Sequence, residues 1–93
     1  MIKKVYSVFD SKAEAYLPPF MFNAHGEAIR AFTDLSNDLN HQFCKYSSDF
    51  CLMHLGDFDD STGLYNLLPI PQSMGLAQEF KKFQSPLSSI AAE

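Results

Sequence analysis

The chain has 93 residues and a formal net charge of −4, and 46% of its residues are hydrophobic. This apolar content excludes an intrinsically disordered chain, and the length limits the protein to one small domain. The acidic balance disfavours nonspecific DNA binding, which depends largely on cationic side chains that replace phosphate counterions, although a local basic patch would still permit it.

The first predicted element is a strand over residues 2–10, which are rich in Val, Tyr, Ile and Phe. Apolar residues occupy both of its faces, a pattern typical of a strand in the middle of a sheet. A second extended segment, residues 15–22, contains Pro18-Pro19. Because proline donates no backbone hydrogen bond, we expect an edge strand or an extended loop there.

The clearest helix follows this extended segment. Asn23 is a suitable N-cap, and Glu27 favours the positive end of the helix dipole. Residues 36–38, with the sequence Ser-Asn-Asp, are expected to end the helix. Its large apolar residues recur at helical spacing: Ile29, Phe32 and Leu35.

The second half of the chain predicts a hairpin. Residues 50–58 and 64–68 alternate as strands on either side of the loop Asp59-Asp60-Ser61-Thr62-Gly63. We expect Pro69 and Pro71 to end the return strand. The connector before the hairpin, residues 39–48, has two expected core anchors: Phe43 and Tyr46.

A short closing element over residues 73–83, whose type the pattern leaves open, completes the predicted domain. The domain then spans residues 1–83, and residues 84–93, rich in Ser and Ala, form a flexible C-terminal tail. The sum of these elements predicts an α+β fold, in which one main helix packs on a face of a small antiparallel sheet of three to four strands.

The acidic residues, the histidines and the cysteines have the side-chain types that bind metal ions. Carboxylates that alternate on a loop can hold Ca²⁺ or Mg²⁺, but the cluster around Asp59 lacks the remaining oxygen ligands of such a site, so we interpret it as a turn. The histidines and cysteines fit no compact zinc spacing. These residues are Asp57, Asp59, Asp60, His25, His41, His54, Cys44 and Cys51. We expect no metal and no cofactor.

The chain also lacks the sequence signatures of an enzyme, a membrane span and a secretory leader. No nucleophile elbow, phosphate-binding loop or dinucleotide fingerprint occurs, so we expect no enzymatic activity. No apolar run approaches the roughly twenty residues of a transmembrane helix, and no apolar leader follows the N-terminal lysines. We expect a soluble protein with reduced thiols in a reducing cytoplasm.

A nucleic-acid interface is one candidate site. Aromatic side chains on a sheet, surrounded by lysines, bind single strands without sequence preference. If the closing element packs beside the first strand, five lysines form one patch. In the rival interpretation, which the sequence favours, the aromatics are core and the lysines a solvated rim. The candidate residues are Lys3, Lys4, Tyr6, Lys12, Lys81 and Lys82.

A protein interface is the other candidate site. Residues 16–22, around Pro18-Pro19, are apolar, and a domain this small has little room to bury them all. Exposed aromatic and Met side chains usually mark an interface, either with another protein or with a second copy of the chain. The candidate interface residues are Tyr16, Phe20, Met21 and Phe22.

Two segments carry a resemblance to a known family. Val5-Tyr6-Ser7-Val8-Phe9-Asp10-Ser11-Lys12-Ala13-Glu14-Ala15-Tyr16-Leu17-Pro18-Pro19-Phe20 and Gly56-Asp57-Phe58-Asp59-Asp60-Ser61-Thr62-Gly63 resemble the small nonstructural protein of gokushovirus-type microviruses (Microviridae), which are single-stranded DNA phages. Ala28-Ile29-Arg30-Ala31-Phe32 matches as well. The resemblance implies a nonstructural role when single-stranded progeny genomes are made, with DNA binding suggested, and offers no catalytic residues.

The functional expectation combines this resemblance with the residues. We expect a non-enzymatic phage accessory protein that acts in the host cytoplasm, in viral genome replication or the switch to single-stranded DNA synthesis, with contact to DNA as one mode of action. The alternative is a protein-interaction module that engages the phage initiator or a host replication factor without DNA contact.

Overall fold

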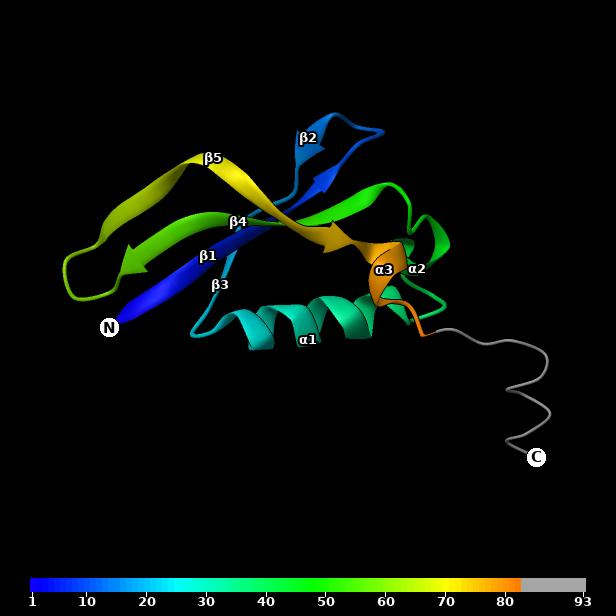
Figure 1. Ribbon diagram of the computed structural model, residues 1–93, viewed down its shortest axis with the longest axis horizontal. Coiled ribbons are helices and arrows are strands. Elements are labelled where there is room, and N and C mark those ends of the chain that lie inside the picture. The colour runs from blue at the N-terminus through cyan, green and yellow to red at the C-terminus, as the bar shows by residue number, and fades with distance from the viewer. Residues whose placement is uncertain (83–93) are drawn as a thin grey trace.

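The computed structural model describes residues 1–82 and shows a curved antiparallel sheet with one long helix lying along its concave face (Figure 1). This confirms the predicted α+β class. The expected tail, residues 84–93, and the last residue of the expected closing element lie outside the described residues. The elements are β1 (Ile2–Asp10), β2 (Ala15–Tyr16), β3 (Phe20–Phe22), α1 (His25–Ser36), α2 (Gln42–Lys45), β4 (Phe50–Asp59), β5 (Leu64–Leu76) and α3 (Ala77–Phe80).

The first strand lies in the middle of the sheet, as its two apolar faces predict. The strand order is β2-β1-β4-β5, and β3 also pairs with β1. Tyr16 of β2 lies opposite Phe9, and Phe20 of β3 lies opposite Tyr6, so both short strands follow the same edge of β1. The two prolines divide this edge into two strands, which brings the sheet to five strands instead of the expected three to four.

The hairpin between β4 and β5 forms at the predicted loop. The backbone N–H of Gly63 donates to the carbonyl of Asp59 over 2.8 Å, and the Asp59 carboxylate accepts from the backbone N–H of Ser61 over 2.9 Å. Gly63 has a φ of 75°, which glycine adopts without strain. The acidic residue Asp59 therefore serves the turn, as interpreted from the sequence.

The expectation that Pro69 and Pro71 end the return strand is wrong, because β5 continues to Leu76. Its pairing with β4 skips from Gly56 opposite Leu67 to His54 opposite Gln72, so residues 68–71 arch away from β4. Both prolines lie in this arch, where β4 requires no backbone N–H from them. The strand then leads into α3, so the closing element is part strand and part helix.

The helix α1 begins one residue later than its predicted N-cap implies. Ala24 is the N-cap, and its backbone N–H donates to the Glu27 carboxylate over 3.1 Å. Asn23 instead accepts a hydrogen bond from Lys3 Nζ over 3.2 Å. In the connector, α2 buries Phe43 as expected, whereas Tyr46 is 59% exposed, so its prediction as an anchor was wrong.

The core lies between α1 and the concave face of the sheet. Phe32 of α1 contacts Phe43 and Phe80, with ring centroids 5.3 and 5.6 Å apart, and thereby joins all three helices. Cys44 is buried as a free thiol. The buried core cluster is Tyr6, Val8, Ala28, Phe32, Phe43, Phe50, Leu52 and Ala77. Within residues 1–82, no helix has the length and apolarity needed to cross a membrane.

Candidate functional site

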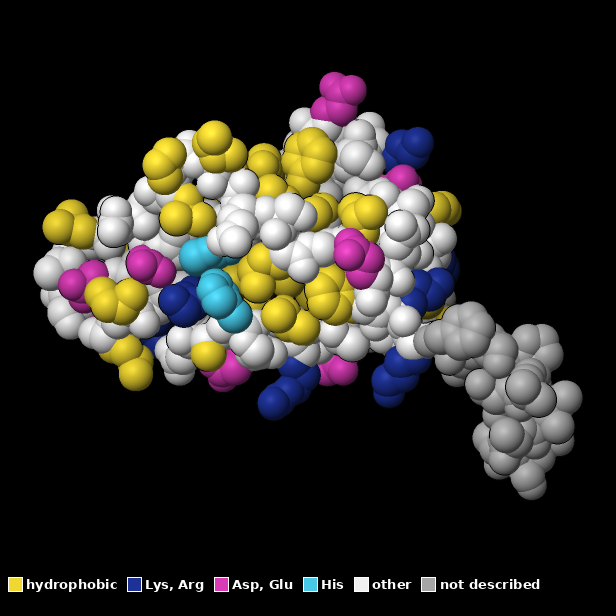
Figure 2. Space-filling model, viewed as in Figure 1, with side chains coloured by type: hydrophobic (Ala, Val, Ile, Leu, Met, Phe, Trp, Pro, Cys, Tyr) yellow, Lys and Arg dark blue, Asp and Glu magenta, His cyan; other side chains and the backbone are white. Residues whose placement is uncertain are grey.

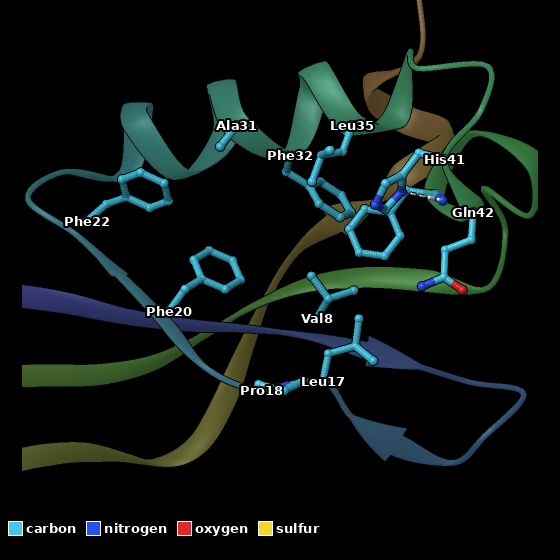
Figure 3. A pocket seen from close by; sticks show the side chains of 11 residues that line it. Val8, Leu17, Pro18, Phe20, Phe22, Ala31, Phe32, Leu35, His41 and Gln42 are labelled. Atoms are coloured by element: carbon cyan, nitrogen blue, oxygen red, sulfur yellow. Dashed lines mark hydrogen bonds between the residues drawn. The ribbon is translucent and has the colours of Figure 1, made fainter.

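A groove of about 430 Å³ opens between α1 and the part of the sheet formed by β1 and β3 (Figure 3). Four phenylalanines line it: Phe20, Phe22, Phe32 and Phe43. Among the described residues that form its wall, only His41 and Gln42 have polar side chains, and no Asp, Glu, Lys or Arg lines it. The groove is therefore an apolar surface whose hydration is unfavourable.

The local sequence explains why the groove stays open. Phe20 and Phe22 are two residues apart on β3 and so project from the same face of the sheet, toward α1 (Figure 3). Across from them, α1 presents Ala31 and Leu35, one helical turn apart. Because alanine has no side chain beyond its Cβ atom, the helix leaves this space unfilled.

One end of the groove is held by the start of α2. The Nδ1 atom of His41 accepts the backbone N–H of Phe43 over 3.0 Å and so caps α2. The two rings lie edge to face with centroids 4.4 Å apart. This hydrogen bond fixes the orientation of the His41 ring at this end of the groove.

The structure separates the four predicted protein-interface residues. Phe20 and Phe22 lie together in the groove wall. Met21 projects from the opposite face of β3, where it lies opposite Val5. Tyr16 is 46% exposed and packs on Phe9, with ring centroids 5.0 Å apart. The groove thus uses two of the four residues, and Leu35 and Ala31, which the sequence reasoning missed, complete it.

Tyr6 is not available for base stacking. Its side chain is fully buried, and its hydroxyl lies 2.6 Å from Nδ1 of His25 in a hydrogen bond. The prediction that β1 displays this ring to a nucleic acid was wrong, because α1 and β3 cover the same face of the strand. The interpretation of the aromatic residues as core is confirmed for Tyr6.

The predicted lysines do not gather into one patch. Lys3 contacts Asn23 before the start of α1, whereas the backbone N–H of Lys82 donates to Asn37 just after its end. A helix of 12 residues separates these points by about 18 Å. Figure 2 shows the basic side chains dispersed over the visible face. The predicted lysines are Lys3, Lys4, Lys12, Lys81 and Lys82, of which Lys12 lies in the turn after β1.

A polar cluster at the start of α1 was not found from the sequence. His25 and His54 pack edge to face with ring centroids 4.8 Å apart, above Tyr6. Nε2 of His54 lies 3.0 Å from the carbonyl oxygen of Gly56 in a hydrogen bond. Nδ1 of His54 and one carboxylate oxygen of Asp57 are buried without a hydrogen-bond partner among the described residues. No spacing motif connects residues 6, 25, 54 and 57, so only the fold reveals the cluster.

The cluster predicts that acidification destabilises the protein. Partial desolvation lowers the pKa of His25, the neighbouring His54 and Lys4 lower it further, and the Asp57 carboxylate offsets these effects only in part. The unfolded chain, with a histidine pKa of about 6.5, then binds a proton more readily than the folded state. Stability is therefore complete above that value and is lost as the pH falls through the lowered pKa.

The measurement is the urea midpoint at pH 7.5 and pH 5.0 for the wild type and for His25→Gln. The amide of glutamine does not titrate, yet its oxygen still accepts a hydrogen bond from Tyr6. We expect the midpoint of the wild type to fall more between the two pH values than that of the variant. Equal shifts in the two proteins would contradict a role for His25.

One comparison with known proteins matches nearly the same range of residues as the described strands and helices. A family model described as Phage ORF5 protein matches residues 3–80, which run from the second residue of β1 to the last residue of α3. No curated protein and no solved structure matched the chain. Since the family model covers most of the chain, the protein belongs to the Phage ORF5 protein family and is a phage protein.

Proposed function

We propose that this phage protein is a non-enzymatic accessory factor that binds a protein partner through the apolar groove beside α1. The observation that carries the proposal is the groove itself, an apolar hollow in whose wall Phe20 and Phe22 remain only partly buried although they pack against the core. Accessible apolar concavities of this kind are typical of recognition sites.

The partner that fits is an apolar segment of another protein. The volume of about 430 Å³ lies within the range of binding pockets, and grooves beside a helix commonly accept large side chains from one face of a peptide. Burying one Leu or Phe side chain contributes about 1.5–3 kcal/mol. Two such side chains in the groove would contribute about 3–6 kcal/mol before the cost of association is subtracted, so further contacts along the segment must supply the rest of the affinity.

The resemblance to the microviral nonstructural protein supports a place in viral genome replication or in the switch to single-stranded DNA synthesis. The phage initiator and a host replication protein are the partners that such a role suggests, and their site of action is the host cytoplasm. No catalytic or cofactor chemistry is needed for this role.

The test uses a photo-crosslinking amino acid at Gln42, an exposed position on the groove rim, in phage-infected cells. We expect a covalent product with a phage or host replication protein. Leu35→Asp should reduce its yield at least about tenfold, because the partner would have to desolvate a carboxylate. Tyr46→Asp is the matched control, since Tyr46 is exposed and lies outside the groove lining.

DNA binding is a second candidate because three lysines lie at one end of the molecule. Lys45 ends α2, and Lys81 Nζ donates to the carbonyl of Cys44 over 3.3 Å, which brings Lys81 and Lys82 beside α2. Fluorescence polarisation of labelled single- and double-stranded oligonucleotides at two salt concentrations tests it. If Lys45→Ala, Lys81→Ala and Lys82→Ala together abolish both oligonucleotide binding and progeny production, and Leu35→Asp changes neither, DNA binding replaces the groove proposal.

A further inference from the structure

The strand β5 forms one edge of the sheet over 13 residues. It pairs with β4 on one side, and no strand within the described part of the chain pairs with its other side. The portion Leu64–Leu67, which we call the β5 arm, pairs regularly with β4 before the arch begins. Figure 1 shows that the arm and its hairpin partner extend beyond the start of α1, so that no helix covers them.

The β5 arm lacks the usual protection of an edge strand. Natural edge strands carry charged side chains, above all lysine, that prevent pairing with another chain. Here residues 61–78 contain no charged residue at all. Pro69 and Pro71 block pairing only in the arch, where they lie. The arm itself therefore presents free backbone hydrogen-bonding groups on a neutral edge.

Large apolar side chains accompany this open edge. Leu64, Tyr65 and Leu67 are 69%, 57% and 59% exposed, and Ile70 in the arch is 78% exposed. Tyr65 packs on Phe58 of β4 with ring centroids 4.9 Å apart, and Leu67, two residues further on, lies on the same face. Figure 2 shows hydrophobic side chains along the upper border of the molecule, over β5.

From these observations we infer that the β5 arm is a self-association site, where a second copy of this chain adds its own β5 arm as an antiparallel strand. An antiparallel pair is related by a two-fold axis, so each arm meets the same segment of the other copy. Each chain carries a net charge of −4. Two such chains repel least where they meet through a neutral surface.

The resulting dimer leaves the groove open. The groove lies beside β3, at the edge of the sheet opposite β5. The pairing therefore joins two sheets edge to edge and keeps one groove on each copy. A partner that carries two apolar segments would bind such a dimer with higher avidity than a monomer. The self-association itself does not depend on the groove proposal.

The test is sedimentation equilibrium of the full chain across a wide concentration range. We expect a reversible species of twice the monomer mass of 10.5 kDa. Leu67→Lys should raise the dimer dissociation constant at least about tenfold, because each chain would then bring a charged side chain against the apolar arm of the other copy. Leu39→Lys is the control: Leu39 is 79% exposed, lies far along the chain from β5, and should leave the dimer unchanged.

A second measurement uses only the wild-type protein, so it tests the self-association even if Leu67→Lys fails to fold. Hydrogen exchange at the amides of residues 64–67 in the wild type should slow as the protein concentration rises, while the amides of residues 29–32 in α1 should not respond. A monomer at all concentrations would overturn the inference. So would a dimer that Leu67→Lys leaves intact, since the contact would then lie elsewhere.

Discussion

Gly56→Ala is expected to remove a large part of the stability of the protein, with a loss of about 2–6 kcal/mol in the free energy of unfolding. The new Cβ atom would lie 2.5 Å from the carbonyl oxygen of Asn66 and 2.6 Å from Cα of Leu67, and backbone atoms cannot rotate away. Gly56 also has a φ of 152°, which alanine rarely adopts. Overpacking and backbone strain each cost about 1–3 kcal/mol, against a total stability of about 5–10 kcal/mol for a domain of this size.

The experiment is urea unfolding followed by circular dichroism, with Gly26→Ala as the matched control. Gly26 lies in the first turn of α1, and an added Cβ atom there would have nothing within 4 Å. Because alanine is the better helix former, Gly26→Ala should raise the free energy of unfolding by up to about 1 kcal/mol. If Gly56→Ala unfolds at the same urea concentration as the wild type, the close crossing of β5 over β4 is not as tight as described.

Phe32→Ala should cost about 3–5 kcal/mol of unfolding free energy. Phe32 is 2% exposed and contacts aromatic rings from both α2 and α3. Its removal leaves a cavity that the surrounding rings cannot fill without moving the two short helices. Thermal and urea unfolding of the variant measure the loss.

Leu35→Ala is the control on the same helix. Leu35 is 37% exposed, because it lines the open groove instead of the closed core, and its truncation should cost about 1 kcal/mol or less. A similar loss for both variants would show that the groove wall bears on stability as much as the core does. The contrast therefore separates residues that hold the fold from residues available for binding.

The parts of the fold that the sequence predicts are those in which local pattern and burial agree. Apolar residues on both faces of residues 2–10 require a strand with neighbours on each side, and β1 has them. The spacing of Ile29 and Phe32 predicts α1, and the Asp-rich loop ending in Gly63 predicts the hairpin. The paired proline predicts an edge strand or an extended loop over residues 15–22, and the structure has two short edge strands there, β2 and β3.

The rest depends on contacts between distant segments. Prolines such as Pro69 and Pro71 would end a strand in the middle of a sheet, but an edge strand that arches away from its neighbour accommodates them. The sequence does not show which strand lies at the edge. Tyr6 suits a stacking surface as well as a core, and α1 decides between them by covering it. The groove arises because the small side chain of Ala31 lies across from β3. The residue spacing within α1 or within β3 does not predict that these two segments face each other.

The pairing of β1 with β4 has a consequence for how the chain folds. Ile2 pairs with Asp59 and Asp10 with Phe50, so the central ladder joins segments at least 40 residues apart. Closing such a loop costs conformational entropy before the hydrogen bonds of the ladder form. This cost slows folding relative to a helical domain of equal length. A nascent chain that ends before residue 50 contains the residues of β1 and α1 but lacks β4, the strand that pairs with β1 along its length. Folding therefore awaits the synthesis of β4, and until then the apolar face of β1 is open to aggregation or to a chaperone.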